Sequence, residues 1–138
     1  MLELLVVITI IALSTGLTML ALRDGQQQQL EQEAVRLAAL LEAGRMESRA
    51  SGRPVSWVPA AGAEFRFEPA TGLSRSDPLP RRWLHEGTRA EVIGAPRVLL
   101  GPDPILPPQR VRILRGSRQL IVATDGLSPF AIEAEAAR

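Results

Sequence analysis

The feature that most constrains the fold is a stretch of nineteen uncharged residues, 4–22, close to the start of the chain. As a helix it would be about 28 Å long, which is close to the thickness of the hydrocarbon layer of a bilayer. A cleaved secretory signal is the alternative, but the stretch exceeds the usual apolar length of a signal and no clear A-x-A site follows it. The pattern therefore favours a membrane-spanning helix. Residues expected within the span include Leu4, Leu5, Val6, Val7, Ile8, Ile10 and Ile11.

A helical pattern continues beyond Arg23 and Asp24 to about residue 50. Residues 26–50 contain no Pro and are dominated by strong helix formers. The apolar residues that recur at helical spacing, and should face a globular domain, are Leu30, Ala34, Leu37, Ala38 and Leu41. The charged residues expected mostly on the other faces are Glu31, Glu33, Arg36, Glu42 and Arg45.

The helix is predicted to stop at residues 51–54, Ser-Gly-Arg-Pro, because Gly can form a left-handed cap and Pro cannot continue a helix. Gly25 and Gly44 are weak points in the helix but not stops. The result is one near-continuous helix of about 48 residues and about 70 Å. Its amphipathic half can lie on a small domain, while its apolar half projects into lipid or into a bundle of identical helices.

From residue 55 onward the pattern changes to short β-like runs separated by Pro and Gly. Strands are expected at 55–58, 64–68, 89–93, 97–100, 111–114, 119–123 and 130–134. Turns are expected at 59–62, 115–118 and 125–126, and a loop at 71–80. The aromatic residues expected in core or sheet packing are Trp57, Phe65, Phe67, Trp83 and Phe130. The sequence therefore predicts an α+β fold, with a transmembrane segment 1–24, an amphipathic helix 25–51 and a β-rich domain 52–138.

The chain offers little chemistry for catalysis. It contains no Cys, which excludes disulfides and thiolate sites, and no Lys that could form a Schiff base. Its one His, His85, cannot build a His-rich metal site and is expected on an exposed connection. A Ser-His-Asp arrangement could be drawn through Asp77, Asp103 or Asp125, but no nucleophile motif accompanies it. We therefore expect a protein that is not an enzyme and holds no metal or cofactor.

Four arginines, Arg110, Arg112, Arg115 and Arg118, lie close together in the sequence and are interleaved with apolar residues. They can form the solvated face of a β-hairpin, or an edge that binds the phosphates of a nucleic acid. The net charge of +1 gives no overall attraction to nucleic acid, and too few aromatic residues accompany the cluster for base stacking. A nucleic-acid partner is therefore not expected, although the four arginines remain a candidate patch for an anionic ligand.

Glu3 is the one charged residue at the start of the apolar helix. Within hydrocarbon a carboxylate is costly without a partner, which points to a purpose. Residues 2–8, Leu-Glu-Leu-Leu-Val-Val-Ile, resemble the start of mature type IV pilins and pseudopilins. Residues 30–41 and the turn at 51–55 resemble pseudopilin H of type II secretion systems and its minor-pilin relatives. The resemblance covers residues 2 to about 55 well and the remainder in outline, where residues 125–130 match loosely.

The resemblance implies a type IV pilin-like fold, with a long N-terminal helix packed on small antiparallel β-sheets. It implies a minor pseudopilin of the type II secretion system that acts in protein export across the outer membrane. Such a protein crosses the inner membrane once, has its C-terminal domain in the periplasm, and contacts other minor and major pseudopilins and the inner-membrane assembly platform. Glu3 would pair with the N-terminal amine of a neighbouring subunit. Two alternatives stay open, namely a minor type IV pilin active in pilus assembly or DNA uptake, and a small periplasmic binding domain with a simple anchor.

The resemblance also implies residues upstream of Met1. In this family a basic leader precedes the apolar helix, a prepilin peptidase removes it, and the new first residue is methylated. Met1 stands where the family has residues just after its cleavage junction. We therefore expect the true start to lie upstream, with a basic leader whose charge would orient the helix.

Overall fold

The computed structural model describes the backbone of residues 1–61, 64–68 and 80–133, and within these ranges the side chains of all residues except 20–24. A single helix, α1 (Leu2–Ser51), is followed in this part of the chain by seven strands. The strands are β1 (Val55–Pro59), β2 (Phe65–Glu68), β3 (Thr88–Val92), β4 (Val98–Gly101), β5 (Gln109–Arg115), β6 (Arg118–Thr124) and β7 (Ala131–Ile132).

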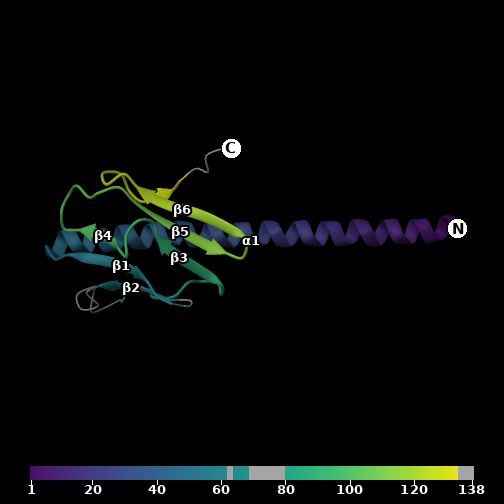
Figure 1. Cartoon of the computed structure of the whole chain (residues 1–138), viewed down its shortest axis with the longest axis horizontal. Coiled ribbons are helices and arrows are strands. Elements are labelled where there is room, and N and C mark those ends of the chain that lie inside the picture. Colours follow the sequence, from purple (N-terminus) through teal and green to yellow (C-terminus); the bar gives the residue numbers. More distant parts are fainter. Residues whose placement is uncertain (62–63, 69–79, 134–138) are drawn as a thin grey trace.

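The strands form two small antiparallel sheets, one in the order β2-β1-β4 and the other in the order β3-β5-β6-β7. Both sheets pack against the C-terminal half of α1, whereas the N-terminal half projects beyond the domain (Figure 1). The predicted α+β architecture is therefore confirmed, and each predicted strand is found to within two residues at either end in the part described. Residues 71–79 of the predicted loop 71–80, and residue 134 of the predicted last strand, lie outside the described residues.

The end of α1 is the predicted one. Gly52 caps the helix in a left-handed conformation, with φ 67°, and its N–H donates to the carbonyl of Ser48 at 2.9 Å. Pro54 follows two residues later and has no N–H with which to extend the helix. The chain then turns directly into β1, which runs back along the amphipathic half of α1 (Figure 1).

The core lies between the sheets and one face of α1. The four residues at the predicted helical spacing, Leu30, Ala34, Leu37 and Leu41, are all fully buried there. The five predicted aromatic residues are buried as well, and four of them gather into one cluster of edge-to-face and tilted ring contacts, namely Trp57, Phe65, Phe67 and Trp83. Packing of this kind is the main source of stability in a domain of this size.

Gly44 marks the closest approach of α1 to the sheets. A Cβ atom at this position would lie 2.7 Å from Cδ1 of Leu100 and 3.0 Å from a ring carbon of Phe67. Both side chains are themselves buried and cannot easily move away. Gly44 therefore costs the helix some intrinsic stability but allows β4 and β2 to pack closely against it.

Two charged residues that were expected mostly on the outer faces of the helix are buried, so that part of the prediction is wrong. Glu33 is 0% exposed and Arg45 is 3% exposed. Oε1 of Glu33 accepts backbone N–H groups from Leu84 at 2.7 Å and from His85 at 3.1 Å. Glu33 thereby fastens the connection between residues 80 and 87 onto α1, and this connection is what buries it.

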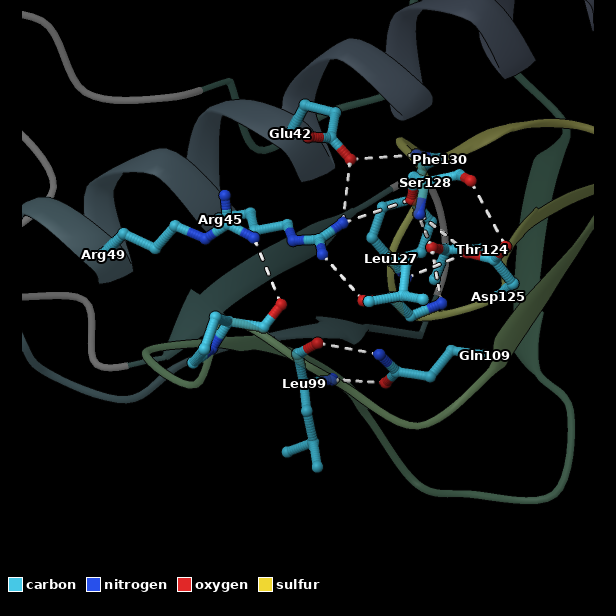
Figure 2. A network of polar contacts seen from close by, with 12 residues as sticks. Glu42, Arg45, Arg49, Leu99, Gln109, Thr124, Asp125, Leu127, Ser128 and Phe130 are labelled. Atoms are coloured by element: carbon cyan, nitrogen blue, oxygen red, sulfur yellow. Dashed lines mark hydrogen bonds and ion pairs between the residues drawn. The ribbon is translucent and has the colours of Figure 1, made fainter.

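Arg45 holds the loop between β6 and β7 onto the other end of α1 (Figure 2). Its guanidinium donates to the carbonyl of Gly126 at 2.9 Å and to that of Ser128 at 3.3 Å. Oε1 of Glu42 lies 3.6 Å from the same guanidinium and accepts the N–H of Phe130 at 2.9 Å. The helix therefore supplies both a donor and an acceptor to the loop, and the buried charge is paired as it must be.

A side chain also joins the two sheets. Oε1 of Gln109, on β5, accepts the N–H of Leu99 at 2.6 Å, and its Nε2 donates to the carbonyl of Leu99 at 2.8 Å (Figure 2). The amide thus binds the edge of β4 much as a neighbouring strand would. This fixes the orientation of β5, and hence of its hairpin with β6, relative to the rest of the domain.

The carboxylate of Asp125 organises the tip of the β6–β7 loop. Its Oδ1 accepts the N–H of Ser128 at 2.7 Å and that of Leu127 at 2.9 Å. Both bonds favour the ionised form and hold the pKa of Asp125 below its ordinary value of 3.8. The bond from Ser128 has the larger effect, and the bond from Leu127 the next largest. The loop that Arg45 binds is therefore also stabilised from within.

We expect the Asp125 contribution to stability to be complete above pH 3.8 and lost as the pH falls through the lower pKa of the folded state. Asp125→Asn should therefore flatten the fall of the melting temperature with pH below about pH 4. Circular dichroism melts across this pH range measure the effect. Asp103→Asn, which removes one negative charge from the neighbouring loop, is the control for net charge, and an equal flattening in both variants would contradict the assignment.

Candidate assembly and membrane-anchoring surface

The N-terminal part of α1 is apolar and packs against nothing within the chain. Residues Leu2–Met19 form an 18-residue segment that is long and apolar enough to cross a membrane, and none of it is buried. The seven residues predicted for the span, from Leu4 to Ile11, are each 48–66% exposed. Apolar area of this extent is unfavourable in water and requires either lipid or other helices around it.

The threonine hydroxyl groups within this segment are satisfied by the helix itself. Thr9, Thr15 and Thr18 each donate to the carbonyl oxygen four residues earlier, at 2.8–2.9 Å. A Thr that bonds to its own helix presents mainly its methyl group to the surroundings. These residues can therefore lie in hydrocarbon without leaving a polar group unsatisfied.

Glu3 lies on the exposed surface of the first turn of α1, among apolar neighbours. The pairing predicted for it is with the amine of another subunit, so this role stays a prediction. Its position on the helix is nevertheless informative, because residues separated by 7 or 11 positions fall within about 20° of each other around a helix axis. The angular position of Glu3 therefore identifies which other side chains share its side of α1.

An exposed stripe continues from Glu3 along the side of α1 that faces away from the sheets. We call it the outward stripe; by this spacing its described apolar members are Ile10, Leu17, Val35, Ala39, Met46 and Ala50. Val35 is 61% exposed and Met46 is 71% exposed, although both lie in the half of α1 that packs on the domain. Ser14, Gln28 and Gln32 are polar members of the same stripe. Beyond a polar stretch at Gln28 and Gln32, the stripe therefore carries exposed apolar residues again, outside the segment that can span a membrane.

The structure separates the four clustered arginines into two pairs. Arg110 and Arg112 point to the face of their sheet opposite to the buried Val111, because side chains alternate along a strand. Arg110 forms an ion pair with Glu133 at 2.5 Å, and Arg112 forms one with Glu91 at 3.2 Å. These two guanidinium groups are therefore already matched by carboxylates.

Arg115 and Arg118 lie opposite each other at the tip of the β5–β6 hairpin. Arg115 points to the same face of the sheet as Val111 and Ile113. It donates to the carbonyl of Glu86 and, at 3.5 Å, to Oγ1 of Thr88. The four arginines therefore do not share one face. The strands therefore do not bring all four into one continuous patch.

The residues of a Ser-His-Asp arrangement are not brought together among the described residues. Nε2 of His85 lies 3.3 Å from Oε1 of Gln32, whereas Asp125 belongs to the loop held by Arg45. Positions 32 and 45 are about 20 Å apart along a helix. Asp77 lies outside the described residues.

Solved structures with the same fold are known, although no protein-family model and no curated protein matches the sequence. One crystal form of the type IV minor pilin FimU of Pseudomonas aeruginosa matches with a TM-score of 0.59 and 15% identity, over 78% of this chain and 90% of that chain. A second crystal form matches with a TM-score of 0.56 and 16% identity, over 76% of this chain and 93% of that chain. The chain therefore has the type IV pilin-like fold, and its exposed apolar helix is consistent with a single-pass membrane-anchored protein.

Proposed function

We propose that this protein is a minor subunit of a type IV pilin-like filament, and that it acts by assembly and not by catalysis. The apolar half of α1 anchors the subunit in the inner membrane, with the β-rich domain in the periplasm. On assembly the helix leaves lipid and packs among the helices of other subunits. Because the helix exchanges one apolar environment for another, the transfer does not require apolar surface to be exposed to water.

The observation that carries this proposal is the outward stripe. A domain with a simple anchor needs apolar surface only within the bilayer, yet Val35 and Met46 are exposed in the half of α1 that lies on the domain. Exposed apolar residues that line up with those of the span favour one continuous contact with neighbouring helices. This is the reason to prefer a filament subunit to a membrane-tethered binding domain.

Glu3 is proposed to pair with the N-terminal amine of a neighbouring subunit, as the resemblance of residues 2–8 implies. In the low dielectric of a helix bundle, an unpaired carboxylate is costly and a paired one is not. The pairing would therefore select incoming subunits and set their axial register. The inner-membrane assembly platform would be a further partner, and prepilin peptidase would be another if a basic leader precedes the helix.

Glu3→Gln is expected to reduce incorporation into filaments at least tenfold, since the neutral side chain cannot form the ion pair; a factor of ten corresponds to about 1.4 kcal/mol. Quantitative blotting of sheared filaments against membrane fractions measures this ratio. Glu31→Gln neutralises an exposed acid on the amphipathic half and serves as the control. Normal assembly by the Glu3 variant would overturn the role given to Glu3.

Within this class, the resemblance of residues 30–55 favours a type II secretion pseudopilin that works with other minor and major pseudopilins in protein export. The likeness to solved type IV minor pilins supports a second candidate, a minor pilin of a type IV pilus. Deletion of the gene separates the two. Loss of secreted proteins from the medium with normal surface pili favours the first, and loss of surface pili with normal secretion favours the second.

A further inference from the structure

The tip of the β5–β6 hairpin lies beside α1 at the point where the apolar segment has just ended. A Cβ atom at Gly116, in the hairpin turn, would lie 3.5 Å from Oε1 of Gln26. Position 26 is four residues beyond the end of the uncharged stretch 4–22, a rise of about 6 Å along a helix. The hairpin is thus the part of the β-domain that comes closest to the membrane-spanning half of α1 (Figure 1).

When residues 4–22 span the hydrocarbon, the level of position 26 along α1 coincides with the polar layer of the bilayer. The headgroup region adds about 5–8 Å on each side of the hydrocarbon, and the Debye length in physiological salt is about 8 Å. Charged side chains at the level of position 26 are therefore within reach of lipid phosphates. Tilting α1 toward the hairpin, by an angle of about 20° that is usual for such helices, would bring the side chains closer still.

The charges at this end of the domain are mainly positive. Arg118 is exposed at the hairpin tip, and Arg115 stands opposite it on β5. Arg89, on β3, is exposed and lies opposite Leu114, at the same end of the sheet but on the other face from Arg115. Among the residues around the tip whose side chains are described, Glu86 is the acid that opposes them, and positions 25–29 of the helix beside them carry no charge. The end that faces the membrane therefore has an excess of positive charge.

We propose that this hairpin end docks on the headgroups of anionic phospholipids while the subunit is anchored in the membrane. Arg118 and Arg115 supply guanidinium groups for lipid phosphates, with Arg89 adding to the attraction. The proposal rests on the membrane anchorage argued above. It excludes Arg110 and Arg112 from the contact, since Glu133 and Glu91 already pair with them on the opposite face of the sheet.

An anionic lipid fits this end better than a nucleic acid does. The gap between hairpin and hydrocarbon is about the depth of the headgroup layer, which leaves no room for a duplex. The five aromatic residues of the chain are all buried in the core, so no aromatic side chain stacks on a base at the hairpin. Docking would hold the domain against the membrane until assembly lifts the subunit out.

The test uses the full chain, reconstituted in vesicles and carrying a label at the hairpin tip. The chain has no Cys, so Ser117→Cys gives one attachment point in the turn and Asp103→Cys gives a control point in the loop after β4. The measurement is the accessibility of each label to a water-soluble quencher. It compares vesicles of phosphatidylcholine alone with vesicles that also contain phosphatidylglycerol.

The label at position 117 is expected to be protected in the anionic vesicles and to become accessible again at high salt, while the label at position 103 does not respond. Arg118→Gln should lower the ratio of docked to undocked domain about fivefold, the usual effect of one basic residue at an anionic surface. Arg112→Gln is the matched control, because it removes an arginine of the same sheet that is paired with Glu91. It should leave protection unchanged.

Flotation of the same vesicles distinguishes the possible failures. A chain that floats with the vesicles but whose hairpin label stays equally accessible in both lipids would overturn the lipid contact and leave the anchorage standing. A chain that does not float would overturn the anchorage itself, and the contact with it. Protection of the label by duplex DNA in neutral vesicles, lost in Arg118→Gln, would show that the hairpin binds nucleic acid instead.

Discussion

Replacing both Val35 and Met46 by Glu is expected to reduce incorporation into filaments at least a hundredfold while leaving the domain folded. Both side chains are more than half exposed, at 61% and 71%, and substitutions at such positions usually change the free energy of unfolding by less than about 0.5 kcal/mol. In a helix bundle the same two carboxylates would be buried without partners, which costs several kcal/mol. The ratio of filament-bound to membrane-bound protein measures assembly, and thermal melting of the full chain in detergent measures the fold.

The control is Ile105→Glu, which places a carboxylate on a side chain that is 70% exposed but lies in the loop between β4 and β5 and not on the outward stripe. Assembly should tolerate this change far better than the double change on the outward stripe. Equal losses in both would show that any added negative charge impairs assembly. Normal assembly of the stripe variant would leave its two exposed apolar residues without the role proposed here.

The second large effect is on stability. Arg45→Met is expected to lower the free energy of unfolding by about 3 kcal/mol, because it leaves a partly exposed carboxylate, a partly buried carbonyl and a buried carbonyl without their charged donor. The groups affected are Glu42 and the carbonyls of Gly126 and Ser128. Denaturant titration of the full chain in detergent, followed by tryptophan fluorescence, measures the change.

Arg49→Met is the matched control for this substitution. Arg49 lies one turn further along α1, is exposed, and donates to the carbonyl of Pro104 at 3.5 Å. Its loss is expected to change the free energy of unfolding by less than about 0.5 kcal/mol. A loss in Arg45→Met no larger than in Arg49→Met would mean that the buried guanidinium does not hold the β6–β7 loop.

Much of the fold could be predicted from local sequence because local rules determine it. The run of helix formers, the spacing of Leu30 to Leu41 and the Gly-Arg-Pro stop each act within one or two turns, so α1 and its inner face follow from the sequence. The alternation in Phe65–Glu68 and the Arg115–Arg118 turn are equally local, and they predict a strand and a hairpin where the structure has them.

The burial of Glu33 and Arg45 could not be predicted in this way. Each is covered by a segment more than 50 residues further along the chain. Helical periodicity contains no information about where such a distant segment packs against the helix. A pattern of apolar residues assigns charged positions to solvent by default. The two residues are buried because backbone groups of the connection at 80–87 and of the loop at 124–130 meet them.

The candidate surface was only partly predictable. The span was identified from its composition, but the outward stripe was missed, although counting in steps of 7 and 11 from Glu3 would have found Val35 and Met46. What the sequence does not contain is the exposure of those two residues, which depends on where the sheets pack. The four arginines were predicted to form one patch because the alternation of side chains along β5 was not followed from Arg112 to Arg115, which lies three residues further on and therefore on the other face.

The central claim is that α1 packs against the helices of other filament subunits along its outward stripe. The most direct test is a photo-activated cross-linking residue at Met46 or Leu17, irradiated in assembled filaments, with the products identified by mass spectrometry. We predict cross-links from both positions to the N-terminal helix of another pilin-like subunit, and none between subunits from the fully buried position 41. Cross-links to lipid alone from position 17, together with no protein product from position 46, would contradict the account.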